Sequence, residues 1–579
     1  MIINIISPAA FEFKIFFDIS LKMLPMCDII NQNEKGVYAM ILLNKNMPAE
    51  VFGILMSAAE RVLSVRKVGL DGGFTVSLEV DCGLCDERYI ITSDCGSCTL
   101  RAAEPLALFA AFGRFLRLSR FDGNGGFEPF VGKLDFTPKK KLRGMYFATH
   151  FDNFYHSAPI EKVCEVVEDL AMRGCNSLLV WFDMHHFTSM EDDGAQSLVK
   201  RLRAILAYAN KIGIGGSLTM ISNEGFSTSP TELRAEWAVQ NGYHASPDSH
   251  YHVEICPSKE GGIEEILRAR RAMLEYFADL KIDYVVYWPY DQGGCTCKDC
   301  VPWGSNGFLK LLPHFKSLIK EMMPNTKVIV SAWYFDRFTS GEWAGFTDRL
   351  RDEVFADVPY ILSFFANGEL PPVLLEKGMP EGVKFIEFPE ISMWTCSPWG
   401  GYGASHLAGF LDRNHTTGKA IYSGAYPYSE GIFEDANKFI ELALYSGECE
   451  SAVDALRVYM NFEFCTDSDE LFEAFLLTEQ TLARKRSHLE NIHVTIADPS
   501  KIEDIRAVFE KYNSILPENI TASRNFRLFY LRALIDSEIV RNDGYSIRSE
   551  LCQQAMREID EIYFVNEKTC PWVRPATGK

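Results

Sequence analysis

The stretch "DYVVYWPYDQGG", residues 283–294, joins a short apolar run to an acidic and polar end. A run of four to eight apolar residues that is rich in β-branched and aromatic types and ends at turn residues is typical of a buried strand. Asp291 and Gln292 follow this run directly, so polar groups stand where the strand ends. One such segment does not define a fold, but a repeated series would.

The pattern is repeated, because eight segments of this kind alternate with helical stretches such as "PIEKVCEVVEDLAMRG" at 159–174. The eight strand segments lie at 142–152, 176–187, 214–225, 283–294, 327–337, 360–369, 384–394 and 419–431. Eight strand–helix units in roughly 300 residues match the number and length of a (β/α)₈ or TIM barrel. In that fold the polar C-terminal strand ends meet at one face, where active sites are built.

Different patterns flank the barrel. Residues 36–135 show short strands and two amphipathic helices, and residues 447–579 are helical throughout. The expected fold class is therefore α/β, with a TIM barrel at 142–446 between a small α/β domain and an α-helical domain. Residues 1–35 are expected to be a poorly ordered leader or the product of translation from an upstream start, because they are apolar but lack the basic region of a signal peptide.

Composition limits the function classes. The 579 residues include 58 Lys and Arg against 78 Asp and Glu, a formal net charge of −20. This charge disfavours nucleic acid and anionic membrane surfaces as partners. No segment has the eighteen or so continuous apolar residues of a membrane span. Sixteen cysteines without an export signal favour a reducing compartment, so we expect a cytoplasmic protein.

Carboxylates stand at three of the expected strand ends: Asp291 after the fourth strand, Glu390 after the seventh and Glu430 after the eighth. A glycosidase needs one carboxyl group to protonate the leaving oxygen and a second as base or nucleophile. Glu387 and Glu390 lie three residues apart, so strand alternation points them to opposite faces and only one can face the barrel mouth. A surface carboxylate or a helix cap is the alternative for each, and Glu430 in particular precedes a helix.

Aromatic and polar side chains are expected at the same strand ends, where they would contact a substrate. Aromatic residues make up 13% of the chain, which fits a large core as well as a site that stacks sugar rings. The predicted contact residues are His150, Asp152, Trp181, Glu224, Trp288, Tyr290, Gln292, Trp333, Asp336, Arg337, Trp394 and Tyr428. Of these, Trp288, Tyr290, Trp333 and Trp394 are expected to line the cleft.

Cysteines form two clusters. Cys295, Cys297 and Cys300 follow the fourth strand and offer three thiolates to a zinc ion, with a fourth ligand such as Cys256 or Cys396 from elsewhere in the chain. The alternative is a set of free thiols in a tight loop.

The second cluster, at 82–98, has the spacing of a zinc site. An intervening strand of about six residues would hold its two cysteine pairs about 20 Å apart, so two separate dithiols or buried thiols are expected instead.

The layout resembles the glycoside hydrolases of families 20 and 67, the β-N-acetylhexosaminidases and α-glucuronidases. The residues that carry the resemblance are the opening strand "LRGMYFATHFDNF", the preceding segment "DERYIITSDCGSCTLRAAEPLALFAAFGRFLRL", "YSEGIFEDANKFI" near the barrel end, and the loop from Asp291 to Cys300. Family 20 enzymes carry an adjacent Asp-Glu pair after the fourth strand, and this chain has Asp291 and Gln292 there. A glutamine cannot act as an acid, so that mechanism is not carried over intact.

The family 67 layout fits better, with the acid after the fourth strand and a base from a later one. The sequence thus predicts a glycoside hydrolase in which Asp291 is the general acid and Glu390 the base or nucleophile. Glu430 would position the substrate or act as a second base. Arg337 is the candidate cation for a uronic acid.

The expected substrate is the end of a short glycan, an N-acetylhexosaminide or a uronide, with no required cofactor beyond a possible structural zinc. No nucleic acid or membrane partner is expected, and a homo-oligomer is allowed. Two alternatives stay open. One is a carbohydrate-binding barrel that lost its activity, and the other is a zinc enzyme that uses Cys295, Cys297 and Cys300.

Overall fold

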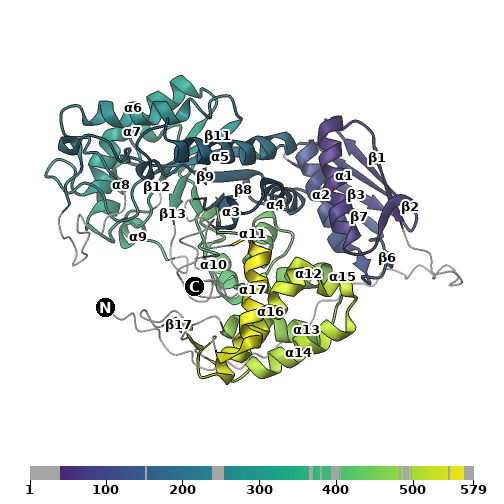
Figure 1. Ribbon diagram of the computed structural model, residues 1–579. Helices are drawn as coiled ribbons and strands as arrows, with labels where there is room; N and C mark the ends of the chain where they lie inside the picture. The colour runs from purple at the N-terminus through teal and green to yellow at the C-terminus, as the bar shows by residue number, and fades with distance from the viewer. Residues whose placement is uncertain are drawn as a thin grey trace, which may run out of the picture. The chain divides into compact units, whose positions relative to one another are not determined.

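The computed structural model describes residues 39–85, 87–149, 153–237, 253–363, 369–378, 381–392, 403–404, 406–481, 484–486, 494–496, 498–545 and 548–565 (Figure 1). All of them belong to one compact unit that extends from Val37. Within these ranges no helix is both long and apolar enough to cross a membrane.

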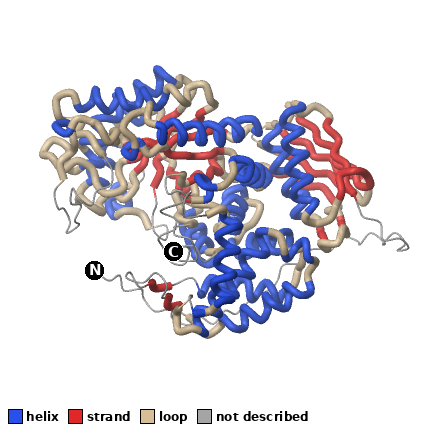
Figure 2. Tube along the Cα trace, viewed as in Figure 1, coloured by secondary structure: helices blue, strands red, loops and turns tan. Residues whose placement is uncertain are grey.

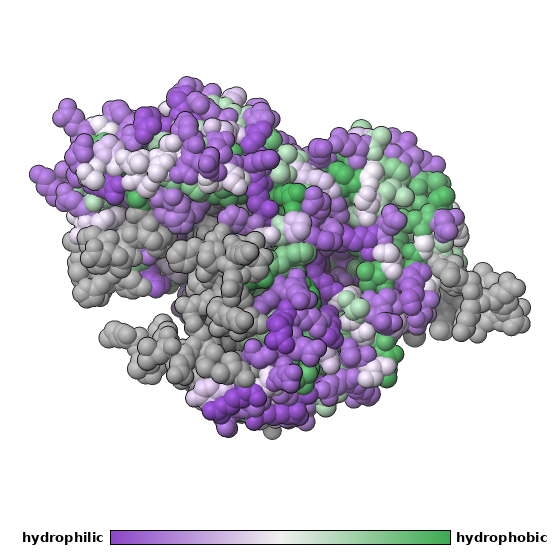
Figure 3. Space-filling model, in the orientation of Figure 1, coloured by the Kyte–Doolittle hydropathy of each residue, from purple (hydrophilic) through white to green (hydrophobic). Residues whose placement is uncertain are grey.

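The N-terminal region is a five-stranded sheet with two helices. The sheet order is β1-β2-β4-β3-β7, with β1 at Ala39–Asn44, β2 at Gly69–Val80, β3 at Tyr89–Ser93, β4 at Ser97–Ala102 and β7 at Gly132–Phe136. The helices are α1 at Ala49–Ser64 and α2 at Pro105–Leu118, and β5 at Arg120–Phe121 pairs with β6 at Phe127–Glu128. Hydrophobic side chains gather over this region in Figure 3. Ile41 and Leu43 of β1 are exposed.

The central region is a closed barrel of eight parallel strands, because β15 pairs with β8. The strands are β8 at Leu142–Phe147, β9 at Ser177–Trp181, β10 at Gly215–Ile221, β11 at Ile282–Trp288, β12 at Lys327–Ser331, β13 at Ile361–Ser363, β14 at Phe385–Glu387 and β15 at Tyr422–Ala425. A two-residue strand, β16 at Tyr428–Ser429, extends the pairing of β8. The predicted fold class is confirmed.

Helices follow the strands and cover the barrel. They are α3 at Phe154–Ser157, α4 at Ile160–Met172, α5 at Asp193–Ile212, α6 at Gly262–Leu274, α7 at Gly307–Met322, α8 at Glu342–Arg349, α9 at Pro372–Lys377, α10 at Ala408–Gly418 and α11 at Asp435–Ser446. The longest, α5, has clear end signals, since the Asp192 side chain accepts from the Gly194 N–H and Gly213 ends the helix at a φ of 111°.

Strand alternation separates the barrel interior from the helix layer. In β11, Val286 and Trp288 pack inside the barrel with residues from the other strands. Tyr287 points outward, where its ring stacks on Phe308 of α7 and its hydroxyl donates to the Phe308 carbonyl at 2.9 Å. The apolar run in the sequence is continuous because both faces of the strand are buried.

The C-terminal region is mainly helical (Figure 2). It contains α12 at Ala452–Glu463, α13 at Asp469–Leu477, α14 at Ile502–Ile515, α15 at Glu518–Thr521, α16 at Arg524–Arg541, α17 at Glu550–Tyr563 and a hairpin of β17 at Arg484–Arg486 with β18 at Val494–Ile496. The side chains of Ser451, Ser468, Ser523 and Ser549 cap α12, α13, α16 and α17. Serine at this position satisfies free backbone N–H groups at a helix start.

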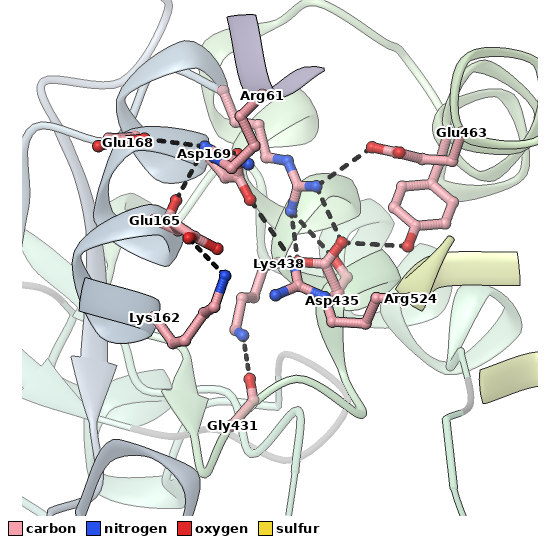
Figure 4. Close-up of polar contacts among 12 residues, drawn as sticks. Arg61, Lys162, Glu165, Glu168, Asp169, Gly431, Asp435, Lys438, Glu463 and Arg524 are labelled. Carbon is pink, nitrogen blue, oxygen red and sulfur yellow. Dashed lines mark hydrogen bonds and ion pairs between the residues drawn. The ribbon is translucent and has the colours of Figure 1, made fainter. Parts of the chain in front are cut away.

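A buried ion network joins helices from all three regions (Figure 4). The Asp435 carboxylate of α11 accepts two hydrogen bonds from Arg173, at 2.9 and 2.8 Å, and one from the Tyr459 hydroxyl of α12 at 3.0 Å. Arg61 of α1 contacts Asp169 of α4 at 2.7 Å. Burial by itself would raise the pKa of Asp435, but the charge and hydrogen bonds of Arg173 hold it well below its usual range.

Candidate active site

Aromatic rings close the barrel interior just below the polar strand ends. Trp288, Trp333 and Phe388 contact one another with ring centroids 5.0–5.3 Å apart, and Tyr146 contacts Phe388 and Tyr428 at 5.5 Å each. All five side chains are buried. Trp288, Trp333 and Tyr428 were predicted contact residues, and the structure brings them together. Sequence reasoning missed Tyr146 and Phe388, although both lie in recognised strand segments.

Asp291 lies at the edge of this aromatic layer. The indole Nε1 of Trp288 donates a hydrogen bond to Asp291 Oδ1 at 3.0 Å. A donor of this kind orients the carboxyl group. Asp291 and the following Gln292 are both half-buried, so this end of β11 is neither core nor open surface.

Glu390 interacts electrostatically with Asp291. Burial raises the pKa of Glu390 above its ordinary value and the charge of Asp291 raises it further, whereas the charge of Arg337 lowers it. Arg337 is exposed, and its guanidinium lies 4.4 Å from the centre of the Tyr334 ring. The arrangement therefore places two carboxyl groups and one cation within electrostatic reach.

Glu387 has a separate environment. It is buried, and it accepts a hydrogen bond from the Tyr445 hydroxyl of α11, on the outer side of the barrel. Burial raises the pKa of Glu387 to about 7. Glu387 and Glu390 thus have different partners, in line with the alternation expected from the sequence.

Glu430 is buried in the loop after β15, where the Tyr428 hydroxyl donates to its Oε1 at 3.0 Å. The loop is held by Glu434, whose Oε1 accepts from the backbone N–H groups of Glu430 and Gly431 at 2.7 Å each. From α17, the Tyr563 hydroxyl donates to the Glu430 carbonyl at 2.8 Å. A residue of the helical region thus contacts the backbone of the eighth strand end.

A second polar group follows β9 and β10. Glu224 has no exposed surface, and its Oε1 lies 2.7 Å from His185 Nδ1. Arg270 of α6 lies 3.7 Å from the other carboxylate oxygen and donates to the Glu224 carbonyl at 3.1 Å. Glu224 was predicted to contact substrate directly, but its burial and these partners give it the role of orienting His185.

Three other acidic and basic groups lie near these residues. Glu254 is buried and accepts from Asn223 Nδ2 at 3.1 Å. Burial raises its pKa well above the ordinary value, and the charges of Glu224 and Asp291 add to that shift. Asp183 lies 2.6 Å from the part-exposed His186. Sequence reasoning missed Glu254 because no strand signal precedes it.

The structure places Tyr290 away from the barrel mouth. Tyr290 is fully buried and its hydroxyl donates to Glu342 Oε2 at 2.6 Å. The reason is that the chain turns at Pro289, next to the last residue of β11. Asp336 is exposed and accepts from the Glu342 N–H at 2.7 Å, at the start of α8, so its contact with substrate stays a prediction.

The other predicted residues are placed as follows. Trp181 is buried, with its ring centre 5.9 Å from that of His185. His150, Asp152 and Trp394 lie outside the described residues, so they stay predictions.

The three cysteines after β11 lie together with a fourth, Cys256, and the ligand atoms of all four are within 4.8 Å of one another. Cys256 Sγ is 3.7 Å from Cys297 Sγ and 3.8 Å from Cys300 Sγ. Cys256 was one of two expected sources of the fourth thiol. Within the described ranges no second group of this kind occurs, and in the 82–98 cluster Cys82 and Cys85 are exposed whereas Cys98 is buried in β4.

Comparisons with known proteins bear on the fold. No protein-family model matches the sequence, and no curated protein shows significant similarity. Solved structures do match. A family 89 glycoside hydrolase from Clostridium perfringens, in complex with its substrate GlcNAc-α-1,4-galactose, has a TM-score of 0.58 at 12% identity. The same enzyme with 2-acetamido-1,2-dideoxynojirimycin gives 0.58 at 13%.

Both matches cover 89% of this chain and 64% of the other, so the chain spans less than two thirds of the length of those proteins. A family 20 exo-β-N-acetylglucosaminidase from Vibrio harveyi matches at a TM-score of 0.44 with 13% identity, over 72% of this chain and 69% of that one. At such low identity the family 89 matches establish a shared fold, and the weaker family 20 match carries no argument. The fold is one that glycoside hydrolases use.

Proposed function

We propose that this protein is a glycoside hydrolase that removes a terminal sugar from a short glycan. The observation that carries the proposal is the pair Asp291 and Glu390, which interact electrostatically at the strand ends above a layer of aromatic rings. Two carboxyl groups that flank a bond are what glycoside hydrolysis requires. Aromatic rings below them suit the apolar faces of a sugar.

The electrostatics favour a protonated Glu390. Its pKa is raised because the side chain is half-buried and lies near the charge of Asp291. Interacting carboxyl groups titrate as a pair, so this shift in the free protein does not by itself assign the roles. We retain Asp291 as the general acid and Glu390 as the base or nucleophile, and the reverse assignment is the alternative that the experiment separates.

The substrate class follows from the groups around the pair. Arg337 is an exposed cation that acts on Glu390, and it would suit the carboxylate of a uronic acid. An N-acetylhexosaminide is the other candidate, since the family 89 enzyme of the same fold was solved with a GlcNAc-α-1,4-galactose substrate. His186, part-exposed and paired with Asp183, would bind sugar hydroxyls.

The test is turnover on a panel of nitrophenyl α- and β-glycosides that includes N-acetylhexosaminides, glucuronides and neutral hexosides. Wild type is compared with Asp291→Asn and Glu390→Gln. Asp279→Asn and Glu381→Gln are matched controls, because both acids are exposed and lie just before the same two strands, at the ends away from Asp291 and Glu390. Loss of a general acid or base lowers the rate by about 10²- to 10⁴-fold. We expect losses of this size in the first two variants and none in the controls.

Leaving-group dependence separates the two roles. A variant that lacks the general acid retains most activity on a dinitrophenyl glycoside, whose leaving group needs no protonation, and loses it on the natural linkage. A variant that lacks the base or nucleophile loses activity on both. Sugar binding without turnover in wild type would overturn the proposal in favour of a carbohydrate-binding barrel.

A further inference from the structure

We infer that Cys256, Cys295, Cys297 and Cys300 bind a structural zinc ion that holds the loop carrying Asp291. A tetrahedral zinc ion with Zn–S bonds of about 2.3 Å places its sulfur atoms about 3.8 Å apart. The distances from Cys256 Sγ to Cys297 Sγ and Cys300 Sγ are 3.7 and 3.8 Å. These separations are nearly twice the length of a disulfide bond, which is about 2.05 Å.

The donor set points to zinc and to a structural role. Thiolate sulfur is a soft ligand that selects zinc over magnesium or calcium. Four thiolates complete the tetrahedron, and a closed site of this kind leaves no position for a reacting water. Three of the four cysteines are buried and Cys297 is half-buried, so solvent access to the group is limited. The geometry therefore disfavours a zinc enzyme that uses these cysteines for chemistry.

Polar contacts around the sulfur atoms complete the site. The Glu236 N–H donates to Cys295 Sγ at 3.4 Å, and Ser258 Oγ lies 3.2 Å from Cys300 Sγ. Lys310 Nζ of α7 in turn lies 3.2 Å from Ser258 Oγ. Hydrogen bonds and a nearby cation stabilise the negative charge of a four-thiolate zinc site, as outer partners do in other metal sites.

The ligands come from two segments of the chain that both lead to the candidate active site. Cys295 follows Asp291 by four residues, and Cys256 follows the buried Glu254 by two. The intervening turn is tightly packed, because a Cβ on Gly294 would lie 2.0 Å from the Trp303 ring. A zinc ion would therefore fix the position of Asp291 through a short and closely packed connection.

Both segments are tied by hydrogen bonds to residues 233–236, and metal binding would reinforce this arrangement. The Thr296 N–H and hydroxyl both donate to the Glu236 carbonyl at 2.9 Å, and the Cys256 N–H donates to the Leu233 carbonyl at 2.8 Å. The stretch of chain between Cys256 and Cys295, which a metal would close, contains α6 and β11. Closing such a stretch by a metal constrains the unfolded chain most, so zinc would also stabilise the fold.

The first test measures metal in the purified protein, prepared without chelator, and does not depend on turnover. We expect about one zinc per chain. Protein produced with Co²⁺ in place of zinc should show the strong ligand-field and charge-transfer absorption of a four-thiolate site. A wild-type protein without bound metal, or with a disulfide among these cysteines, would overturn the inference whether or not the protein is a hydrolase.

Matched variants locate the ion. Cys297→Ser removes a half-buried ligand, and Cys164→Ser changes a half-buried cysteine outside the cluster. We expect Cys297→Ser to contain well under one zinc per chain and to lose the four-thiolate spectrum, while Cys164→Ser keeps both. Full zinc content in Cys297→Ser would contradict the assigned ligands. Protease cleavage within 291–300 should become faster on zinc removal and slow again when zinc is returned.

Discussion

At the scale of single residues, Glu390 lies between a like charge and an opposite one. Burial and Asp291 raise its pKa, and Arg337 lowers it. Its protonation state near neutral pH therefore depends on two neighbours that follow two other strands, β11 and β12. This makes the pH profile of the protein a direct report on the candidate site.

Arg337→Ala should move the Glu390 titration to higher pH, because it removes the charge that lowers the pKa of Glu390. If Glu390 is the ionised base or nucleophile, the acidic limb of the kcat/KM profile shifts to higher pH. If Glu390 is the proton donor, the alkaline limb shifts to higher pH. Arg351→Ala, an exposed arginine of the same strand–helix unit, should leave the profile unchanged. A downward shift would contradict the arrangement of charges described above.

Two helix glycines, one in close contact with a neighbouring helix and one facing open space, allow a matched test of helix packing. A Cβ on Gly113 of α2 would lie 2.1 Å from the Met172 carbonyl oxygen of α4, whereas a Cβ on Gly53 of α1 meets nothing within 4 Å. Gly113→Ala should cost about 1–3 kcal/mol or more, because backbone cannot move aside as a flexible side chain can. Gly53→Ala should stabilise by about 0.5–1 kcal/mol. Denaturant midpoints measure both, and equal effects would contradict the close α2–α4 contact.

At the scale of elements, the contact of Asp435 in α11 with Arg173 connects two barrel helices to the helical region. Asp435→Asn should destabilise by about 3–5 kcal/mol, since it leaves a buried arginine without its charged partner. Asp352→Asn disrupts an exposed ion pair with Arg349 and should cost no more than about 1 kcal/mol. Chemical unfolding of both variants beside wild type tests the difference.

The cost of Asp435→Asn should also depend on pH. The pKa of Asp435 is lowered by folding, so its contribution is fully present above the ordinary Asp value of about 3.9 and is lost as pH falls through the folded value. The difference in free energy of unfolding between wild type and Asp435→Asn should therefore be constant at pH 5–8 and should become smaller in strong acid. A difference that grows as the pH falls would contradict the lowered pKa of Asp435.

At the scale of the whole molecule, the helical region contacts the barrel close to the candidate site. Tyr563 of α17 donates to the Glu430 carbonyl at 2.8 Å, and its ring packs on Phe154 and Phe433. Tyr563→Phe should cost about 0.5–1.5 kcal/mol through the lost hydrogen bond, and Tyr563→Ala about 3–5 kcal/mol through the lost packing as well. We expect turnover to fall in the same order. Normal turnover in Tyr563→Ala would show that α17 supports stability alone.

The order of elements could be predicted because its signals are local. The run from Asp283 to Gly294 contains all of β11 except Ile282, and "LALFAAFGRFLRLS" at 106–119 contains nearly all of α2. The sequence did not predict β7, which is short and half-buried and pairs with β3 from some forty residues away. Edge strands of this kind depend on a partner strand more than on their own residues.

Part of the candidate site was predictable, because that part also depends on local strand signals. Asp291, Glu390 and Glu430 follow recognisable strands, so a barrel brings them to one face. The place of Tyr290 was misjudged because its partner, Glu342, lies on the next helix and has no local signal. Tyr146, Phe388 and Glu254 were missed because their burial and neighbours arise only after the barrel closes.

The sequence by itself thus determined the barrel, its polar face and the cysteine-rich loop, because strand and helix periodicity is encoded within ten to twenty residues. Only the tertiary structure decided which side chains meet. It placed Cys256 beside cysteines some forty residues later, brought Asp291 within electrostatic range of Glu390, and buried Tyr290 against Glu342. Such contacts depend on strand order, on which face of each strand is inside, and on packing between distant elements, none of which a local pattern specifies.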